Sequence, residues 1–98
     1  MLTTAGSLEE SDRLAPVLVR GRLAACVQIM PITGYYRWKD ELRSDPEHLL
    51  PIKTRASRFN DGRAALPKTH SYEVPDLMQL SVEQRLPAYL EWVSENTR

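Results

Sequence analysis

The stretch from Leu23 to Thr54 constrains the fold more than any other part of this 98-residue chain. Its first arm begins with the β-rich run Leu23–Ile29, its second arm returns through Leu49–Ile52, and the polar residues Lys39–Glu41 lie between them. Two such arms around a polar turn are typical of a β-hairpin. A hairpin of this length extends beyond the core of so short a chain, and its aromatic side chains then need cover. We therefore expect another subunit to pack against it.

Composition excludes several classes of function. The chain is long enough for one domain, residues 1–98. Its thirteen basic and thirteen acidic residues cancel, so no electrostatic feature points to nucleic acid. No apolar run reaches the ~20 residues that cross a bilayer, and no signal-peptide pattern is present, so we expect no membrane contact. The single cysteine, Cys26, excludes an internal disulfide and favours a reducing, cytoplasmic location.

The N-terminal part predicts a strand followed by a helix. Residues 1–4 have the pattern of a strand, and Ser7 with Glu10 forms a capping box that begins the helix. Apolar residues at helical spacing continue toward Gly21, which we expect to end the helix in the left-handed conformation. Pro16 removes one backbone hydrogen bond inside this helix and predicts a kink.

The arms of the hairpin predict two faces. In an alternating strand, Tyr36 and Trp38 share one side, and Tyr35 and Arg37 share the opposite side. Pro31 and Gly34 predict a bend or a bulge in the first arm. In the second arm Pro51 has no N–H to donate to a ladder, so we expect its nitrogen to face outward or to lie at a bulge.

The remaining elements complete a β-α-β-β-α-β order with an extra C-terminal helix. Ser57 is the expected cap of a second helix, residues 72–80 predict a fourth strand, and Pro87 suits the first turn of the last helix. Two split β-α-β halves imply an α+β fold, a ferredoxin-like antiparallel sheet with helices on one face. No internal repeat is visible.

Three residues are candidate metal ligands. His70 and Glu73 stand three residues apart before the predicted strand and are able to share a cation or a proton; alternatively they hold the strand entry by hydrogen bonds. One imidazole and one carboxylate fall short of a firm site, and symmetry between subunits would have to supply the rest. Cys26 is a soft copper ligand, a nucleophile or, most commonly for a buried cysteine, a small apolar filler.

The aromatic residues have two readings as well. Tyr36, Trp38 and Trp92 form either a platform for ligand stacking or an interface between subunits, and packing is the commoner role. Lys53 at a strand end binds an anion or pairs with a carboxylate. The acidic residues around the hairpin turn have no fixed geometry in the sequence, and we interpret them as a solvated turn: Asp40, Glu41, Asp45 and Glu47.

Five motifs in order resemble the CutA family, the divalent-cation tolerance proteins. They span nearly the whole chain and are Leu23-Ala24-Ala25-Cys26-Val27, Tyr36-Arg37-Trp38, Ile52-Lys53-Thr54, His70-Ser71-Tyr72-Glu73-Val74-Pro75 and Tyr89-Leu90-Glu91-Trp92. The resemblance implies a tight homotrimer, related in shape to the PII signalling proteins, in which the long hairpin reaches its neighbours. Family copper ligands are a cysteine at the end of the first strand and two adjacent histidines. They correspond here to Thr3, Thr69 and His70, so His70 alone keeps the family's ligand.

Together these observations predict a non-catalytic homotrimer that binds copper, another divalent cation or a small ligand in clefts between subunits. The predicted metal ligands are His70, Glu73 and Cys26; the predicted cleft residues are Lys53, Tyr72 and Trp38; the predicted trimer interface contains Tyr36, Trp38 and Trp92. The alternative is a non-catalytic trimeric scaffold, or a PII-like signalling protein, that presents a surface to another protein. No phosphate loop, HExxH, CxxC or nucleophile-elbow pattern indicates an enzyme.

Overall fold

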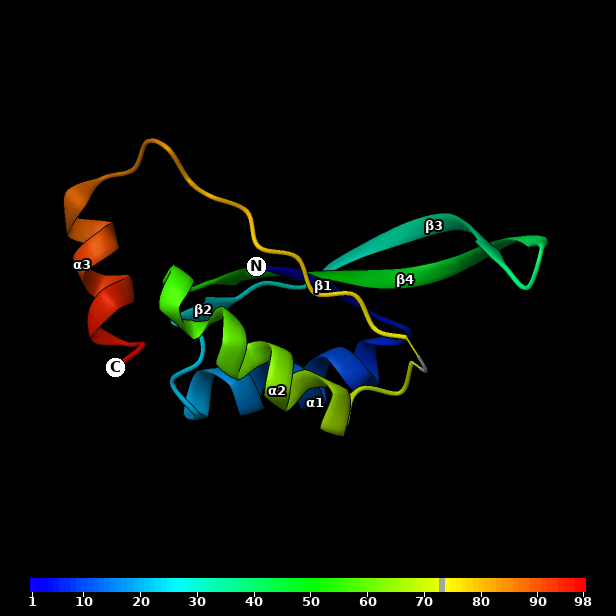
Figure 1. Ribbon diagram of the computed structural model, residues 1–98, viewed down its shortest axis with the longest axis horizontal. Coiled ribbons are helices and arrows are strands. Elements are labelled where there is room, and N and C mark those ends of the chain that lie inside the picture. The colour runs from blue at the N-terminus through cyan, green and yellow to red at the C-terminus, as the bar shows by residue number, and fades with distance from the viewer. Residues whose placement is uncertain (73) are drawn as a thin grey trace.

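The computed structural model describes residues 1–72 and 74–98, with the side chains of residues 67–69 outside the description. Four strands form one antiparallel sheet in which β4 is paired with β1, β2 and β3. α1 and α2 lie on the same side of this sheet, and α3 lies beyond one end of it (Figure 1). The predicted α+β class is confirmed. The elements are β1 Leu2–Ala5, α1 Leu8–Arg20, β2 Cys26–Val27, β3 Met30–Trp38, β4 Glu41–Lys53, the 3-10 turn η1 Ala56–Arg58, α2 Phe59–Thr69 and α3 Pro87–Glu95.

The core lies between the two helices and one face of the sheet. Its buried apolar members are Ala5, Leu14, Leu18, Ala24, Leu50, Ile52 and Leu66. Because side chains alternate along a strand, Leu50 and Ile52 of β4 point toward the helices while Leu49 and Glu47 point away. The register Thr4↔Leu49 puts Thr4 on that second face as well. We call the side of the sheet opposite α1 and α2 the open face.

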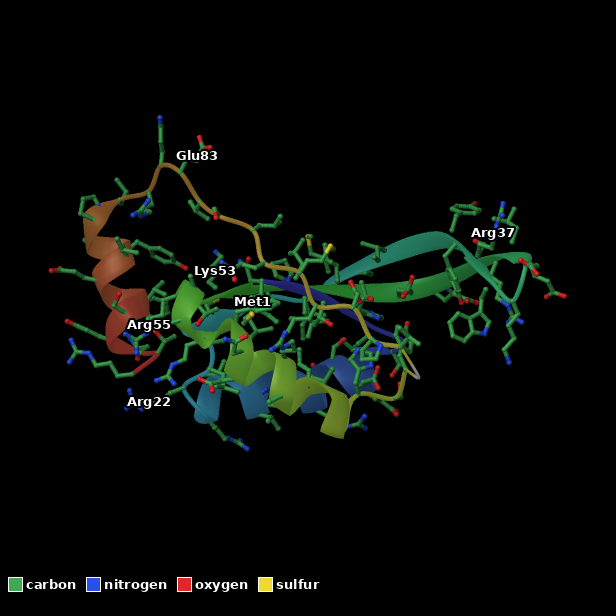
Figure 2. The ribbon with its side chains drawn as sticks, viewed as in Figure 1. Met1, Arg22, Arg37, Lys53, Arg55 and Glu83 are labelled. Carbon is green, nitrogen blue, oxygen red and sulfur yellow. The ribbon has the colours of Figure 1, made fainter. Side chains whose placement is uncertain are left out.

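The hairpin of β3 and β4 extends well beyond the core (Figure 1). The chain measures 45 × 27 × 21 Å, with a radius of gyration of 14.2 Å. A compact domain of this length has a radius of gyration of about 12.6 Å. Figure 2 shows Arg37 near the far end of the hairpin, away from the helices. The predicted hairpin, and its overhang, are confirmed.

The hairpin closes in two residues. Lys39 and Asp40 have φ values of 51° and 63°, the left-handed pair that a type I′ turn requires. The strands keep one register from Cys26↔Lys53 to Trp38↔Glu41, so the bulge predicted at Pro31 or Gly34 is wrong.

A short interruption between β2 and β3 occurs instead at Gln28 and Ile29, and the register puts Gln28 opposite Pro51. The Gln28 N–H donates to the Pro51 carbonyl at 3.0 Å. Pro51 has no N–H to return that hydrogen bond, and the ladder is therefore incomplete at this pair.

The ends of α1 follow the capping prediction with two changes. The Ser7 Oγ accepts from the Glu10 N–H at 3.1 Å, while the Glu10 carboxylate accepts from the Gly6 N–H rather than from that of Ser7. At the other end Gly21 has a φ of −78°, and Arg22 takes the left-handed conformation with a φ of 58°. The Leu23 N–H donates to the Leu18 carbonyl, which completes a Schellman motif one residue later than predicted.

The predicted strand over residues 72–80 is wrong in extent. In the described part of this segment, Met78 alone pairs with the sheet, through two hydrogen bonds with Leu2. The preceding ladder position is taken by a side chain, because the Asp76 Oδ1 accepts from the Thr4 N–H at 3.2 Å. Pro75 has no N–H to offer. The segment therefore follows the edge of β1 without forming a strand.

The last two helices differ from prediction at single residues. Ser57 lies within η1, and α2 begins after Arg58 without a side-chain cap. α3 begins at Pro87, as predicted, but of its apolar stripe Val93 alone is buried. Within the described ranges, no helix is long and apolar enough to cross a membrane.

Candidate ligand-binding hollow

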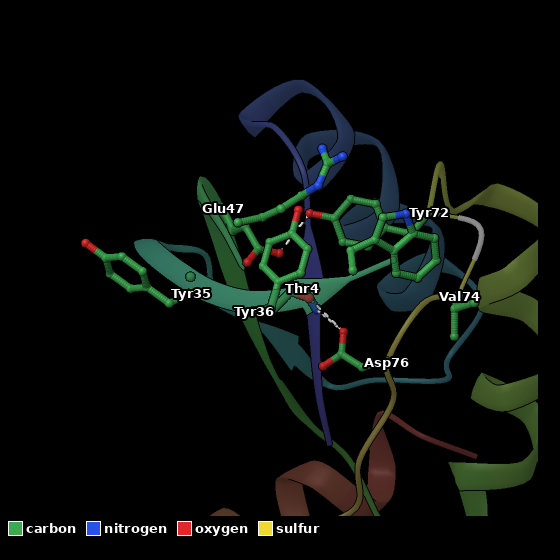
Figure 3. Close-up of a pocket in the computed structure, with 10 residues that line it drawn as sticks. Thr4, Tyr35, Tyr36, Glu47, Tyr72, Val74 and Asp76 are labelled. Carbon is green, nitrogen blue, oxygen red and sulfur yellow. Dashed lines mark hydrogen bonds between the residues drawn. The ribbon is translucent and has the colours of Figure 1, made fainter. Parts of the chain in front are cut away.

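A hollow of about 450 Å³ lies at the base of the hairpin (Figure 3). β1, β3, β4 and the segment that follows α2 all contribute to its walls. Its lining is aromatic and charged, and consists of Thr4, Gly34, Tyr35, Tyr36, Trp38, Arg43, Glu47, Tyr72, Val74 and Asp76. Three of the sequence predictions, Tyr36, Trp38 and Tyr72, therefore meet in one place.

The hairpin register decides which side chains face the hollow. Tyr36 lies opposite Arg43 and Trp38 lies opposite Glu41, and residues directly opposite share a face. Glu47 occupies the same face because it lies an even number of residues from Arg43. Tyr35 belongs to the other face, is 73% exposed and points away from Tyr36 in Figure 3. The predicted separation of Tyr36 and Trp38 from Tyr35 is confirmed.

Glu47 and Tyr72 form the central polar contact of the hollow. The Tyr72 hydroxyl donates to the Glu47 Oε2 at 2.8 Å. A methyl group built on Gly34 would lie 2.1 Å from the Glu47 Oε1, so the carboxylate crosses the hairpin where β3 has no side chain. Burial of Tyr72, and then its hydrogen bond to Glu47, raise the pKa of this phenol well above its usual range. Tyr72 is therefore a neutral donor at physiological pH.

Two further carboxylates around the hollow are also hydrogen-bonded. The Tyr36 hydroxyl donates to the Asp45 Oδ2, and this bond raises the pKa of Tyr36. The Thr4 Oγ1 donates to the Asp76 Oδ1 at 2.7 Å. Each of these carboxylates has a fixed partner.

His70 contacts both the backbone and the ring of Tyr72. Its side chain is buried, and its Nε2 lies 2.6 Å from the Thr4 carbonyl. Its Nδ1 accepts from the Tyr72 N–H at 3.1 Å, so the Nε2 carries the proton. The His70 and Tyr72 rings have centroids 4.8 Å apart. Both ring nitrogens are therefore engaged within this chain.

Glu10 completes this buried cluster. Its carboxylate accepts from the Gly6 N–H at 3.1 Å and from the Ser71 N–H at 2.7 Å, and its Oε1 lies 4.0 Å from the His70 Nδ1. Burial alone would raise the pKa of Glu10, but the hydrogen bonds from Ser71 and Gly6 outweigh it, and the pKa is lowered. Glu10 thus joins the start of α1 to the segment that carries Tyr72.

Of the three predicted metal ligands, the structure describes His70 and Cys26, and these two contact different strands of the sheet. Cys26 is half-buried on β2 in register with Lys53, whereas His70 bonds to Thr4 of β1. Glu73 lies outside the described residues. Among the residues that the structure does describe, no three or more His, Cys, Asp or Glu side chains lie close enough together to hold a metal ion. Metal binding by these residues stays a prediction.

The predicted cleft and interface residues fall into two groups. Tyr72, Trp38 and Tyr36 line the hollow. Lys53 lies near α3, where its Nζ is 5.6 Å from the centre of the Tyr89 ring. Trp92 also packs on Tyr89, with ring centroids 5.6 Å apart. The chain by itself does not bring Lys53 to the hollow.

Sequence analysis did not assign the carboxylates at and beside the hollow, or the glycine that makes room for one of them. Asp45 and Glu47 were interpreted as a solvated turn, and this is wrong because each accepts a tyrosine hydroxyl. Gly34 was assigned to a bulge, and Asp76 had no assigned role. Alternation along the second arm places Arg43, Asp45 and Glu47 on one face with Tyr36, and this was the available signal.

Comparison with known proteins agrees with these features. The model of the family described as CutA1 divalent ion tolerance protein matches residues 1–96. The divalent-cation tolerance protein CutA of Thermus thermophilus is 39% identical over 98 residues, covering 99% of this chain and 95% of that protein.

Two solved structures have the same fold. The periplasmic divalent cation tolerance protein CutA from Archaeoglobus fulgidus has a TM-score of 0.96 at 34% identity, covering 99% of this chain and 95% of that one. The PII-like protein CutA from a Nostoc species, in apo form, has a TM-score of 0.92 at 28% identity, covering 99% and 92%. The family match over residues 1–96 and the identity to these relatives show that the chain belongs to the CutA1 divalent ion tolerance family.

Proposed function

We propose that this protein is a cytoplasmic homotrimer that binds a divalent cation, copper among them, or a small ligand in clefts between its subunits, without catalytic turnover. The observation that carries the proposal is the uncovered hairpin and open face. In the described part of the chain, no helix lies on either side of the two-stranded ribbon where it leaves the core (Figure 1). Such a ribbon is marginal in water without further packing.

The open face has the composition of an interface. Met30, Tyr36 and Met78 are 47%, 39% and 51% exposed, and Leu2 and Leu49 are half-buried beside them. Exposed apolar side chains that adjoin one another mark surfaces that another molecule covers. Symmetric copies of this chain are the partner that we propose, since most oligomers are homo-oligomers with closed symmetry.

The names of the relatives support a role in divalent-cation tolerance. A metal bound to His70 would have to take the place of one present partner, the Tyr72 N–H at Nδ1 or the Thr4 carbonyl at Nε2. Glu73 of the same segment and Cys26 remain the other proposed ligands, and symmetry would combine residues of two subunits at one cleft.

Two measurements test this proposal. Sedimentation at micromolar concentration should give a trimer, and a monomer would refute the assembly. Copper titration by calorimetry should give less heat for His70→Ala than for wild type. The matched control is His48→Ala, which removes the other histidine and should leave the heat unchanged. Equal heats for wild type and His70→Ala would exclude His70 as a ligand.

The alternative function is a scaffold or a PII-like signalling protein that presents a surface to a protein partner. One observation favours it: α3 exposes Tyr89, Leu90 and Trp92, and its N-cap residue Leu86 is also exposed. A metal that binds the native state must raise its stability by mass action. Thermal unfolding that is identical with and without copper, zinc and a chelator would support the scaffold over the metal-binding trimer.

A further inference from the structure

Three arginine side chains meet at the C-terminal end of α3. The Arg22 Nη1 donates to the Glu95 carbonyl at 3.3 Å. Arg55 donates to the Thr97 carbonyl through two nitrogens, Nε at 3.1 Å and Nη2 at 2.6 Å. The Arg58 Nε donates to the same oxygen at 2.5 Å. Figure 2 shows Arg22 and Arg55 at this end of the molecule, opposite the tip of the hairpin. We call Arg22, Arg55 and Arg58 the arginine cluster.

The positive charge of the arginine cluster is not balanced within the chain. Because Arg55 and Arg58 donate to one oxygen, nitrogens of their two guanidinium groups lie within about 5 Å of each other, where like charges repel. Among the described residues, Arg58 pairs with Asp61 at 3.2 Å, whereas neither Arg22 nor Arg55 forms an ion pair. The negative end of the α3 dipole offsets roughly half a charge. An excess of positive charge therefore remains.

The arginine cluster also has unused hydrogen-bond donors. A guanidinium group carries five N–H donors. Among the described residues, the Arg55 Nη1 and the Arg58 Nη2 have no acceptor. The two Nη nitrogens of Arg55 form an edge of the kind that binds two oxygens of one oxyanion. Arg55 is partly exposed and the Arg58 side chain is 25% exposed, so an anion from solvent reaches both.

Charge and donor geometry favour a phosphate group over other ligands. The excess positive charge repels a metal cation. A carboxylate carries one negative charge and two oxygens, whereas a doubly ionised phosphate monoester carries two charges and three strong acceptor oxygens. Such an anion accepts from Arg55 and Arg58 together and lowers their mutual repulsion. Its binding therefore strengthens the contacts of both arginines with Thr97, which hold α3.

We propose that the arginine cluster binds a phosphate dianion, free or as a phosphate monoester, and that the bound phosphate fastens α3 to η1 and the start of α2. The phosphate accepts from the Nη nitrogens of Arg55 and from the Arg58 Nη2, and Arg22 adds charge nearby. This inference goes beyond the proposed function, because the three arginines belong neither to the open face nor to the proposed metal ligands and interface residues. Its outcome is independent of copper binding and of assembly.

Three probes with one tetrahedral shape test the charge preference. At mildly alkaline pH, inorganic phosphate and β-glycerophosphate are dianions, whereas dimethyl phosphate is a monoanion. Titrations followed by phosphorus NMR at constant ionic strength should give binding about tenfold tighter for the dianions than for dimethyl phosphate. Tighter binding of β-glycerophosphate than of phosphate would support the site with phosphate monoesters as its ligands, and the reverse order would support it with free phosphate. Equal affinities for all three probes would overturn the proposal.

Matched variants locate the site. Arg55→Lys keeps the charge but loses the edge of two nitrogens, and should weaken phosphate binding about tenfold. Arg58→Lys should weaken it as well. Arg37→Lys makes the same change near the tip of the hairpin (Figure 2) and should leave binding unchanged. Circular dichroism verifies that each variant is folded, and wild-type affinity in both Arg55→Lys and Arg58→Lys would refute the site.

Proteolysis tests the link between the site and α3. Phosphate should slow cleavage between Met78 and α3 several-fold in the wild type, because a ligand of the docked state stabilises it. Sodium chloride at the same ionic strength should not, and Arg55→Lys should lose the protection by phosphate. Unchanged or faster cleavage of the wild type in phosphate would show that the anion does not strengthen the contacts with Thr97, and would overturn the proposed geometry.

Discussion

Replacing Gly34 with alanine tests the geometry of the hollow most directly. A Cβ at this position would lie 2.1 Å from the Glu47 Oε1 and 3.3 Å from its carboxyl carbon. No real carbon–oxygen contact is that short, so the Glu47 side chain must rotate away. Its hydrogen bond from the Tyr72 hydroxyl, now 2.8 Å long, is then lost.

The size of the effect follows from two opposing contributions. A hydrogen bond to a charged group contributes about 1.5–3 kcal/mol to stability when its donor is partly buried. Gly34 does not have a positive φ, so alanine suits its backbone and stabilises by about 0.4–1 kcal/mol through the unfolded state. The free energy of unfolding of Gly34→Ala should therefore fall by about 1–2 kcal/mol. The melting temperature should fall by about 4–8 °C for each kcal/mol.

Chemical denaturation of wild type, Gly34→Ala, Tyr72→Phe and the double variant completes a double-mutant cycle. All four are measured at one protein concentration, because the stability of an oligomer depends on it. If the hydrogen bond is the cause, Gly34→Ala should destabilise wild type and should not destabilise Tyr72→Phe. The Tyr72 phenol should also ionise at lower pH in Gly34→Ala, measured by ultraviolet absorbance. A fully additive cycle with an unchanged phenol titration would refute the reasoning.

Three further predictions concern the turn, the buried carboxylate and α3. Asp40→Gly should raise the free energy of unfolding by about 1 kcal/mol in urea denaturation, because glycine takes the φ of 63° without strain. Wild type should lose stability as the pH falls below the ordinary Glu10 value of 4.5, since its folded pKa is lower and its carboxylate form stabilises the fold above that range. Glu10→Gln should flatten this acid dependence in melting scans, and an unchanged slope would contradict it. Arg55→Ala removes two hydrogen bonds to the Thr97 carbonyl, of 3.1 and 2.6 Å, and should speed proteolysis between Met78 and α3; equal cleavage rates would show that α3 is held otherwise.

The position of Arg55 explains why that last change should matter. Figure 2 shows Arg55 beside the C-terminal end of α3. Arg58 donates to the same Thr97 carbonyl at 2.5 Å, and Arg22 donates to the Glu95 carbonyl at 3.3 Å. Positive side chains at the C-terminal end of a helix also oppose its dipole. α3 thus owes much of its position to side chains from other elements.

Local signals were sufficient for most of the fold. Three predictions that depend only on neighbours in the sequence are confirmed. They are the cap at Ser7, the helix start at Pro87, and the shared face of Tyr36 and Trp38. The strand over residues 72–80 failed because its outcome depends on a distant partner. Asp76 satisfies Thr4 with its side chain, and no pattern inside the segment announces that choice.

In the candidate site, too, some features have a local sequence signal and others depend on distant contacts. Tyr36, Trp38 and Tyr72 were selected as single residues, and the register of β3 on β4 was needed to place Glu47 across Gly34. The local sequence around a carboxylate near a turn is the same whether the side chain is solvated or hydrogen-bonded to a tyrosine. The deciding contact, from the Tyr72 hydroxyl, spans 25 residues of sequence.

Glu10 connects a local sequence signal, helix capping, with the contacts of the candidate site. As a capping residue it accepts the Gly6 N–H, and as a buried carboxylate it accepts the Ser71 N–H and lies 4.0 Å from the His70 Nδ1. His70 in turn fixes the Tyr72 backbone, and Tyr72 holds Glu47 in the hollow. A residue that sequence analysis assigns to helix capping therefore belongs to a chain of contacts that ends at the hollow. Because His70 has a structural task at both of its nitrogens, the loss of ligand binding in a His70 variant is informative only beside Glu47→Gln, which changes the hollow and leaves that task intact.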